Sequence, residues 1–522
     1  MTPQPLFEHP GATRSARRLL LISYHFPPDT TIGARRWEKL SHFVAERGWG
    51  LDVVTCTEPG ADLSRLELLP EDTRVYALPP QYMHAAEWIE HQAWRVYRTI
   101  LPAPGTAPAA GNGNAAPEAA RMEAARVDST RPETTHSAAA SRNATAGEAA
   151  SRAHPDTVSR HDIRWWPPTP RKLLRTYWVW LDFARHARWA KDAVRLGERI
   201  LEPGVHFAVV TSGPPHMTHE TGRVLSLRHG LPFVMDMRDP WSLNERVTER
   251  WASPSWLRGT ARHERQMVDQ AALVVANTEP ARDALARAYP DASDRIITVM
   301  NGSDDDPLPP QRRGGRFTIG YAGTVYDYGD PQSLFRAAAR VIRDLGLTPD
   351  DFGMDFIGSF DDGGEQALRD AARSEGVESF VSVGPTRSHD GAMQFLSQAT
   401  MLVTFPGWNS VAVPGKVFEC VRFDAWLLAL SDVGSATDLL LRGTDADVVP
   451  RDDIDGIARV IAKRYQAHLR GEEATHIARD ERFSRRRQAR ILLDALARLA
   501  PPSEIQPPRG KDARTQRTSY SR

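Results

Sequence analysis

Short apolar runs alternate with amphipathic segments along most of this chain. Leu19–Ser23 is the first run, Leu51–Thr55 is the second, and between them Trp37, Leu40 and Val44 recur at intervals of three and four residues. A short apolar run is typical of a strand buried on both faces, whereas intervals of three and four predict one face of a helix. The opening of the chain therefore predicts a strand, a helix and a parallel strand.

The alternation continues in two halves separated by a polar segment. Further strands are predicted at 207–212, 231–235, 272–277 and 296–300 in the first half, and at 317–321, 355–358, 381–384, 401–405 and 426–430 in the second. Strands that alternate with helices form mostly parallel sheets covered on both faces. We expect an α/β protein with two Rossmann-like domains facing a cleft, at 18–302 and 316–482, a linker at 303–315 and a closing helix within 483–500.

Three segments lack this pattern. Residues 1–17 and 501–522 have no apolar periodicity, and residues 103–160 consist mostly of Ala, Gly, Pro, Ser and Thr with scattered charges. A segment with so few apolar side chains does not bury enough surface to offset the entropy of ordering. We expect two disordered tails and a disordered insertion in the first domain.

Composition narrows the class of protein. The 522 residues include 66 basic and 66 acidic side chains, and this balance gives no bulk attraction to nucleic acid. Cys56 and Cys420 each lie in an apolar element and predict reduced core thiols, which are typical of a cytoplasmic protein. No apolar run approaches the ~18 residues of a membrane-spanning helix.

An aromatic and basic stretch at 164–191 allows two interpretations. It begins with two Trp beside two Pro and continues with a helical pattern in which Arg and Lys outnumber Asp. Such a helix can rest on an anionic membrane surface, in peripheral contact with the inner face of the membrane. Packing of its aromatic side chains against the first domain is the alternative.

The clearest candidate chemistry lies in the second half, in the segment 405–430. Behind a loop that ends in Pro414 and Gly415, a helix is predicted to open at Lys416, with Glu419 one turn further on. Free N–H groups, the helix dipole and the lysine charge suit a diphosphate, and the carboxylate can accept hydrogen bonds from sugar hydroxyls. A lysine and a glutamate that merely sit in a solvated first turn are the alternative.

Other candidates follow predicted strands. Gly323 and Thr324 end one strand in the second half, where small side chains let the backbone approach a phosphate. In the first half, Gly33, Arg35 and Arg36 precede a helix and suit an anionic group, unless the arginines are surface charges. The loop 212–219 and the pair Arg238–Asp239 also follow strands, and that pair can equally be a structural ion pair. The triplet 304–306 has the Asp-x-Asp spacing of a metal-held diphosphate site but lies in the predicted linker.

These motifs resemble family 4-type retaining glycosyltransferases. Pro414, Lys416 and Glu419 match the Pro-x-Lys-x-x-Glu segment of one subgroup, and 238–241 matches its Arg-Asp-x-Trp element. The loop 212–219 is similar to its Ser-x-Pro-Pro loop, and the segments YHFPPDTTIGARR, NTEPARDAL, VMNG and IGYAGT extend the resemblance over most of 18–499, outside the insertion.

The resemblance implies a GT-B fold and the transfer, with retention, of a sugar from a nucleotide-diphosphate donor to a glycan or lipid-linked acceptor, as in bacterial surface polysaccharide or glycoconjugate synthesis. The implied catalytic residues are Asp239, Lys416 and Glu419. The implied donor contacts are Gly323, Thr324, Asn409, Pro414, Gly415, Lys416 and Glu419, and the implied acceptor contacts are Gly33, Arg35, Arg36, His219, Arg238 and Asp239. No metal and no cofactor beyond the nucleotide sugar are expected.

The chain departs from the family at two points. The wider family has two glutamates separated by seven residues, whereas Val411 stands where the first is expected, and TVYDYGDPQ replaces the Arg and Lys that usually follow the Gly323 strand. Two alternatives therefore stay open: a nucleotide-sugar epimerase of the same fold, for which His216 and His219 are candidate cleft residues, and a catalytically inactive scaffold.

Overall fold

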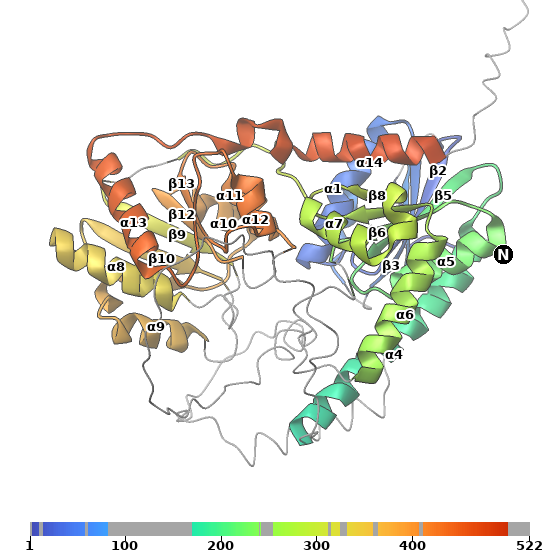
Figure 1. Ribbon diagram of the computed structural model, residues 1–522. Coiled ribbons are helices and arrows are strands. Elements are labelled where there is room, and N and C mark those ends of the chain that lie inside the picture. Colours follow the sequence, from blue (N-terminus) through green and yellow to red (C-terminus); the bar gives the residue numbers. More distant parts are fainter. Residues whose placement is uncertain are drawn as a thin grey trace, which may run out of the picture.

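The computed structural model contains two sheets of mostly parallel strands that lie side by side, each covered by helices on both faces (Figure 1). It describes residues 3–9, 14–57, 61–81, 170–239, 241, 254–311, 315–323, 331–358, 364–406 and 411–499. The fold is α/β, with two Rossmann-like domains, as expected from the alternation of strands and helices.

The first sheet has eight strands in the order β1-β4-β3-β2-β5-β6-β7-β8, and all neighbours are parallel except β1 and β4. In that order the strands are Phe7–Glu8, Thr73–Leu78, Gly50–Cys56, Arg18–Ser23, His206–Gly213, Phe233–Met237, Leu273–Ala276 and Ile296–Thr298. Every residue of β2 and β3 is buried, which explains their continuous apolar runs.

The second sheet is wholly parallel, in the order β11-β10-β9-β12-β13-β14. In that order the strands are Val381–Gly384, Phe352–Ile357, Phe317–Ala322, Met401–Thr404, Trp426–Leu430 and Asp447–Val449. The chain order 3-2-1-4-5-6 is that of a Rossmann sheet, and β4-β3-β2-β5-β6-β7 repeats it in the first domain. The direction of winding therefore reverses between β2 and β5, and again between β9 and β12.

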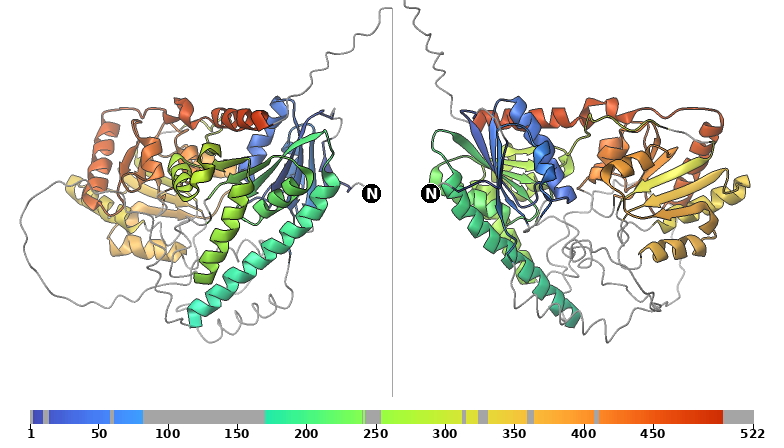
Figure 2. Two further views of the ribbon diagram at one scale, coloured as in Figure 1. Left: turned by 45° about the vertical axis from the view of Figure 1, so that its right-hand side comes forward. Right: turned by 180° about the vertical axis from the view of Figure 1, so that it is seen from behind.

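Helices cover the sheets in layers. In the first domain, α1 (Arg35–Glu46) and the last helix α14 (Arg485–Leu499) lie on one face, and α4 (Pro170–Ile200), α5 (Thr218–His229), α6 (Pro254–Gln270) and α7 (Glu279–Ala288) lie on the other. In the second, α8 (Gln332–Leu345), α9 (Gly364–Ser374) and α13 (Ile454–Leu469) lie opposite α10 (His389–Leu396), α11 (Gly415–Cys420) and α12 (Ala436–Leu441). Figure 2 shows α14 running back from the second domain to the first.

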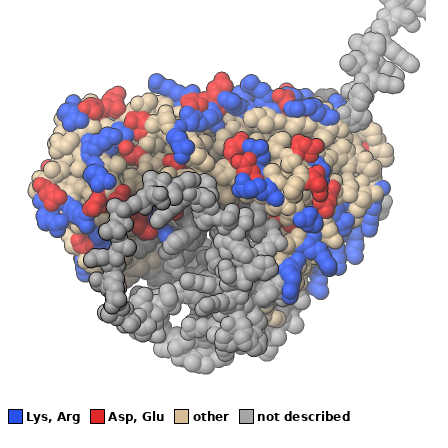
Figure 3. Space-filling model, in the orientation of Figure 1, with Lys and Arg blue, Asp and Glu red and all other residues tan. Residues whose placement is uncertain are grey.

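The segment that leaves the first domain pairs with the segment that returns to it. Ser303 forms an isolated parallel bridge with Ser484, whose hydroxyl accepts a hydrogen bond from the N–H of Arg487 and so caps α14. Acidic and basic side chains are interspersed over the upper part of the surface, in keeping with their equal numbers (Figure 3).

Several predicted elements need correction or lie outside the described residues. Part of the expected disordered tail, Phe7–Glu8, is a strand that pairs with β4, and two residues are too few to give a periodic signal. Cys56 and Cys420 are buried free thiols, as predicted. The expected insertion at 103–160 and tail at 501–522 lie outside the described residues.

Candidate active site

The best-formed candidate site lies where the winding of the second sheet reverses. Gly323 directly follows β9, and Lys416 stands in the first turn of α11, the helix after β12. A Cβ atom on Gly323 would lie 1.5 Å from Nζ of Lys416, so only glycine leaves room for the lysine. The φ of Gly323 is 146°, a conformation that also favours glycine. Ligands of open α/β sheets bind at such switch points.

Lys416 is a cation held in a desolvated position. Its Nζ donates a hydrogen bond of 3.0 Å to the hydroxyl of Tyr321 and lies 4.8 Å from the centre of that ring. Tyr321 is its one hydrogen-bond partner in the described part of the chain. Burial lowers the pKa of Lys416 to about 8, against smaller opposite effects of Cys420 and Glu419. An anion at this position would recover the cost of desolvation.

Glu419 lies one turn beyond Lys416 and contacts the first domain. Its Oε1 accepts a hydrogen bond of 2.8 Å from Arg35, at the start of α1. The same guanidinium lies 2.9 Å from Nε2 of His389, in the first turn of α10, and 3.8 Å from Asp304. Burial, with the charge of Arg35, lowers the pKa of His389, so the imidazole accepts as the neutral form. Arg35 therefore joins the two domains across the predicted donor residues.

A second bridge joins the domains where the family expects a glutamate. The hydroxyl of Thr278, the residue that caps α7, donates to the backbone carbonyl of Val411. The side chain of Val411 packs with the apolar residues behind β6 and β7. This position therefore provides no carboxylate, and its backbone serves the contact between domains. Pro414 precedes α11, which begins at Gly415 and has no side-chain cap. The N–H of Val417 donates to the carbonyl of Pro414, and the N–H groups of Gly415 and Lys416 have no partner among the described residues.

Two of the predicted acceptor residues serve the fold. Arg36 is 4% exposed, donates two hydrogen bonds of 3.0 Å to Asp236 and further ones to Asn301 and the carbonyl of Val299. His219 is fully buried, and burial lowers its pKa to about 3. Its Nε2 faces the backbone at Gly213, under the sheet edge. Arg36 and His219 thus lie among residues that hold the fold, since neither side chain is more than 4% exposed, and their expected contact with an acceptor stays a prediction.

Arg238 also holds the protein backbone in place. Its guanidinium donates to the carbonyls of Gly33, Gly213 and Pro214, and so ties the loop after β2 to the loop after β5. A Cβ on Gly33 would lie 2.7 Å from this guanidinium. Asp239 follows, half-buried at the end of β6. The structure thus brings Gly33, Arg35 and Arg238 together, with Arg35 facing the second domain. Thr324 and Asn409 lie outside the described residues.

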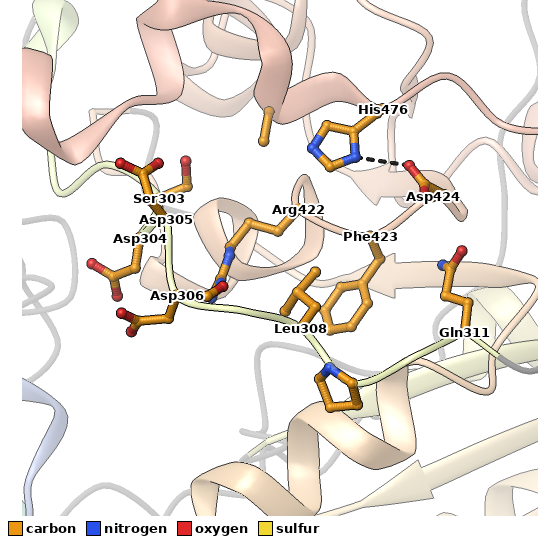
Figure 4. Close-up of a pocket in the computed structure, with 12 residues that line it drawn as sticks. Ser303, Asp304, Asp305, Asp306, Leu308, Gln311, Arg422, Phe423, Asp424 and His476 are labelled. Carbon is orange, nitrogen blue, oxygen red and sulfur yellow. Dashed lines mark hydrogen bonds and ion pairs between the residues drawn. The ribbon is translucent and has the colours of Figure 1, made fainter.

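Two of the three linker aspartates, Asp304 and Asp306, pair with cations. Asp304 is 9% exposed and pairs with Arg485, and Asp306 accepts a hydrogen bond of 2.7 Å from Lys39. They line a pocket of about 440 Å³ together with Arg422 and the His476–Asp424 pair (Figure 4). In the described residues, no cluster of three or more His, Cys, Asp or Glu side chains could hold a metal ion.

Sequence reasoning missed three contributors to the site. Tyr321 was placed in a strand but given no role, although its hydroxyl binds Lys416. His389 and the pairing of Arg35 with Glu419 were also missed, because the pair is separated by 384 positions. One feature of the sequence could have pointed to them: each of these residues ends or follows a predicted parallel strand. The carboxyl ends of parallel strands share one edge of a sheet, so residues there lie close together.

Comparison with known proteins identifies the fold. No protein-family model matches the sequence, and no curated protein matches it either. Among solved structures, the Anabaena protein HepE in complex with UDP has a TM-score of 0.53 at 11% identity, over 92% of this chain and 100% of its own. The N-terminal domain of Candida albicans trehalose-6-phosphate phosphatase has a TM-score of 0.53 at 10% identity, over 95% and 99%.

A glycosyltransferase from Rickettsia africae has a TM-score of 0.51 at 9% identity, over 92% of this chain and 98% of its own. At this level of identity the likeness defines the fold alone. With the repeated strand order and the facing sheet edges, it establishes the GT-B fold.

Proposed function

We propose that this protein is a retaining glycosyltransferase that moves a sugar from a nucleotide-diphosphate donor to a glycan or lipid-linked acceptor. The observation that carries the proposal is Lys416, held over Gly323 at the switch point of the second sheet. A desolvated cation that pairs with no carboxylate among the described residues matches the dianionic leaving group of such a donor. Retention rests on the resemblance to family 4-type enzymes.

The remaining donor contacts follow from this position. The ammonium of Lys416 lies beside the backbone of Gly323, and Lys416 itself stands in the first turn of α11, which has no side-chain cap. Glu419 lies one turn away, where its carboxylate would accept hydrogen bonds from hydroxyls of the ribose or sugar. To do so it must exchange its bond with Arg35 for one with the donor. Departure of the diphosphate needs stabilisation of negative charge, which these groups provide.

The acceptor side is the edge of the first sheet. Arg35 is the predicted acceptor residue that faces the second domain, and Asp239 lies half-buried at the end of β6. The proposed reaction takes place in the cytoplasm, at the inner surface of the membrane, in the synthesis of a bacterial surface polysaccharide or glycoconjugate. In the described part of the chain, no helix combines the length and the apolar character that crossing a bilayer requires.

The donor can be tested directly. The Anabaena protein of the same fold is described with UDP and with UDP-glucose, so uridine nucleotides are the first to try. We expect UDP to raise the melting temperature and UDP-glucose to be hydrolysed slowly without acceptor, with the α anomer released first. An epimerase would interconvert the donor sugar instead, and a scaffold would do neither. Of the two candidate histidines of an epimerase, His219 is fully buried and His216 is partly buried.

A metal-free mechanism is part of the proposal. Asp304 and Asp306 are paired with Arg485 and Lys39 rather than gathered around one point. Hydrolysis of UDP-glucose is therefore expected to survive EDTA. Loss of turnover with EDTA, restored by magnesium or manganese, would contradict this and move the donor phosphates towards the linker.

A further inference from the structure

The solvent-exposed face of α4 has an unusual order of side chains. Among the described side chains of α4, the exposed ones recur at intervals of three and four residues and so form one stripe. They are Leu173, Tyr177, Trp180, Ala184, Arg188, Lys191, Arg195 and Arg199. The first four are apolar or aromatic, and the last four are basic.

The apolar end of the stripe is well exposed for its size. Leu173 is 51% exposed, Tyr177 45% and Trp180 37%. Trp180 contacts Trp256 of α6, with ring centres 5.2 Å apart, and so fixes the two helices side by side. The opposite face of α4 packs on the first domain through Trp189 and Ala193, which are buried. Of the two interpretations of this stretch, packing holds for one face of the helix and leaves the other free.

α6 extends the basic area. Its exposed positions include Arg258, Arg262 and Arg265, and Figure 3 shows basic side chains gathered over α4 and α6 at the lower right. The stripe itself contains no acidic residue, although the partly exposed Asp182, Asp192 and Glu198 flank it and Asp192 pairs with Arg195, and the chain as a whole is neutral. The excess of positive charge is therefore local to this surface.

The apolar end of the α4 stripe extends beyond the carboxyl edge of the first sheet, where the predicted acceptor residues lie. α4 precedes β5 and runs antiparallel to it, so its first turns lie towards the carboxyl edge. Tyr24, directly after β2, packs against His186 at 5.1 Å between ring centres, and so marks the level of that edge on α4. Leu173 lies thirteen residues earlier, about 20 Å further along the helix axis.

We propose that the exposed faces of α4 and α6 are a docking surface for an anionic lipid bilayer. Leu173, Tyr177 and Trp180 would enter the interface between headgroups and acyl chains, while Arg188 and Lys191 contact the headgroups. The docking rests on this surface alone. This surface lies beside the carboxyl edge of the first sheet. If the protein has the proposed glycosyltransferase activity, a docked bilayer would therefore present a lipid-linked acceptor to Arg35.

Co-sedimentation with vesicles tests the proposal. The full-length protein is expected to bind vesicles of phosphatidylcholine and phosphatidylglycerol, to bind phosphatidylcholine alone far less, and to be released by salt. Arg188→Gln with Lys191→Gln should lower the partition coefficient by about thirtyfold, because each basic residue near an anionic surface contributes about fivefold. Leu173→Gln should lower it as well. The matched control is Arg343→Gln with Arg459→Gln, two arginines with similarly exposed side chains in the second domain.

Three results would overturn the proposal: no binding, equal binding to neutral vesicles, or equal loss in the control variant. Binding that occurs only after deletion of 103–160 would also overturn it, because the occupant of the face would then be that segment. UDP affinity is measured on the same samples. It is expected to be unchanged in all variants, so failure of the docking proposal is separable from failure of the proposed glycosyltransferase activity.

Discussion

At the carboxyl edge of the first sheet, Arg36 and Arg238 form several hydrogen bonds within the protein. At the same edge of the second sheet, Lys416 has a single hydrogen-bond partner among the described residues. Arg36 is enclosed by Asp236, Asn301 and Val299, and Arg238 is bound to three backbone carbonyls. Lys416 has Tyr321 alone among the described residues. The same strand order therefore supports two uses of positive charge, one to fix loops and one to meet an anion.

The largest effect is expected where the charge is locked into the fold. Arg36→Met leaves buried Asp236 without its cationic partner and with the Trp37 indole N–H as its remaining close donor, which should lower the free energy of unfolding by about 3 to 5 kcal/mol. Urea unfolding measures it, with Arg35→Met as the neighbouring control on the same helix. If UDP affinity falls while stability holds, Arg36 belongs to a ligand site and the contrast between the two edges fails.

Lys416→Met should have the opposite profile. Loss of the charge-assisted bond to the diphosphate is expected to weaken UDP binding by about 1.5 to 3 kcal/mol. Stability should hold or rise, because the variant no longer desolvates a cation. Calorimetric titration with UDP and a thermal melt separate the two quantities. Lys463→Met, on exposed α13, is the matched control. Unchanged affinity in Lys416→Met would remove the diphosphate from this position.

The lowered pKa gives a pH test of the same comparison. Free Lys416 loses its proton near pH 8, and a bound diphosphate favours the charged form, so UDP binding should take up a proton above about pH 8 and weaken as pH rises. For unfolding the sign is reversed: above pH 8 the unfolded chain holds more protons at this lysine, so its contribution to stability rises with pH up to the ordinary lysine range. Titration in buffers of different ionisation enthalpy measures the uptake, which Lys416→Arg should abolish.

The sequence was sufficient for most of the fold because each element carries its own signal. The strand Trp426–Leu430 agrees with prediction at both ends, and the helix Arg485–Leu499 lies within its predicted range. A buried apolar run and an amphipathic pattern are local properties of the sequence. The site was harder. His219 and Arg36 are polar residues in loops or helix starts, like true ligand residues, and only their burial assigns them to the fold. Burial depends on partners distant in the sequence.

The smallest expected effect concerns the bond between the domains. Arg35 and Glu419 each have about a quarter of their side chain exposed, so a double-mutant cycle of Arg35→Met and Glu419→Gln should give a coupling of about 0.5 to 1 kcal/mol in thermal or urea unfolding.

If Glu419 turns to the sugar when the donor binds, that coupling should vanish in saturating UDP-glucose and persist in UDP without the sugar. Ribose and sugar hydroxyls are thereby distinguished, since loss of the coupling already in UDP assigns the carboxylate to the ribose. A coupling that stays constant in both ligands would make Glu419 a structural partner of Arg35. Glu419 would then serve the fold, as Arg36 and Arg238 do at the first sheet, and would not bind the donor.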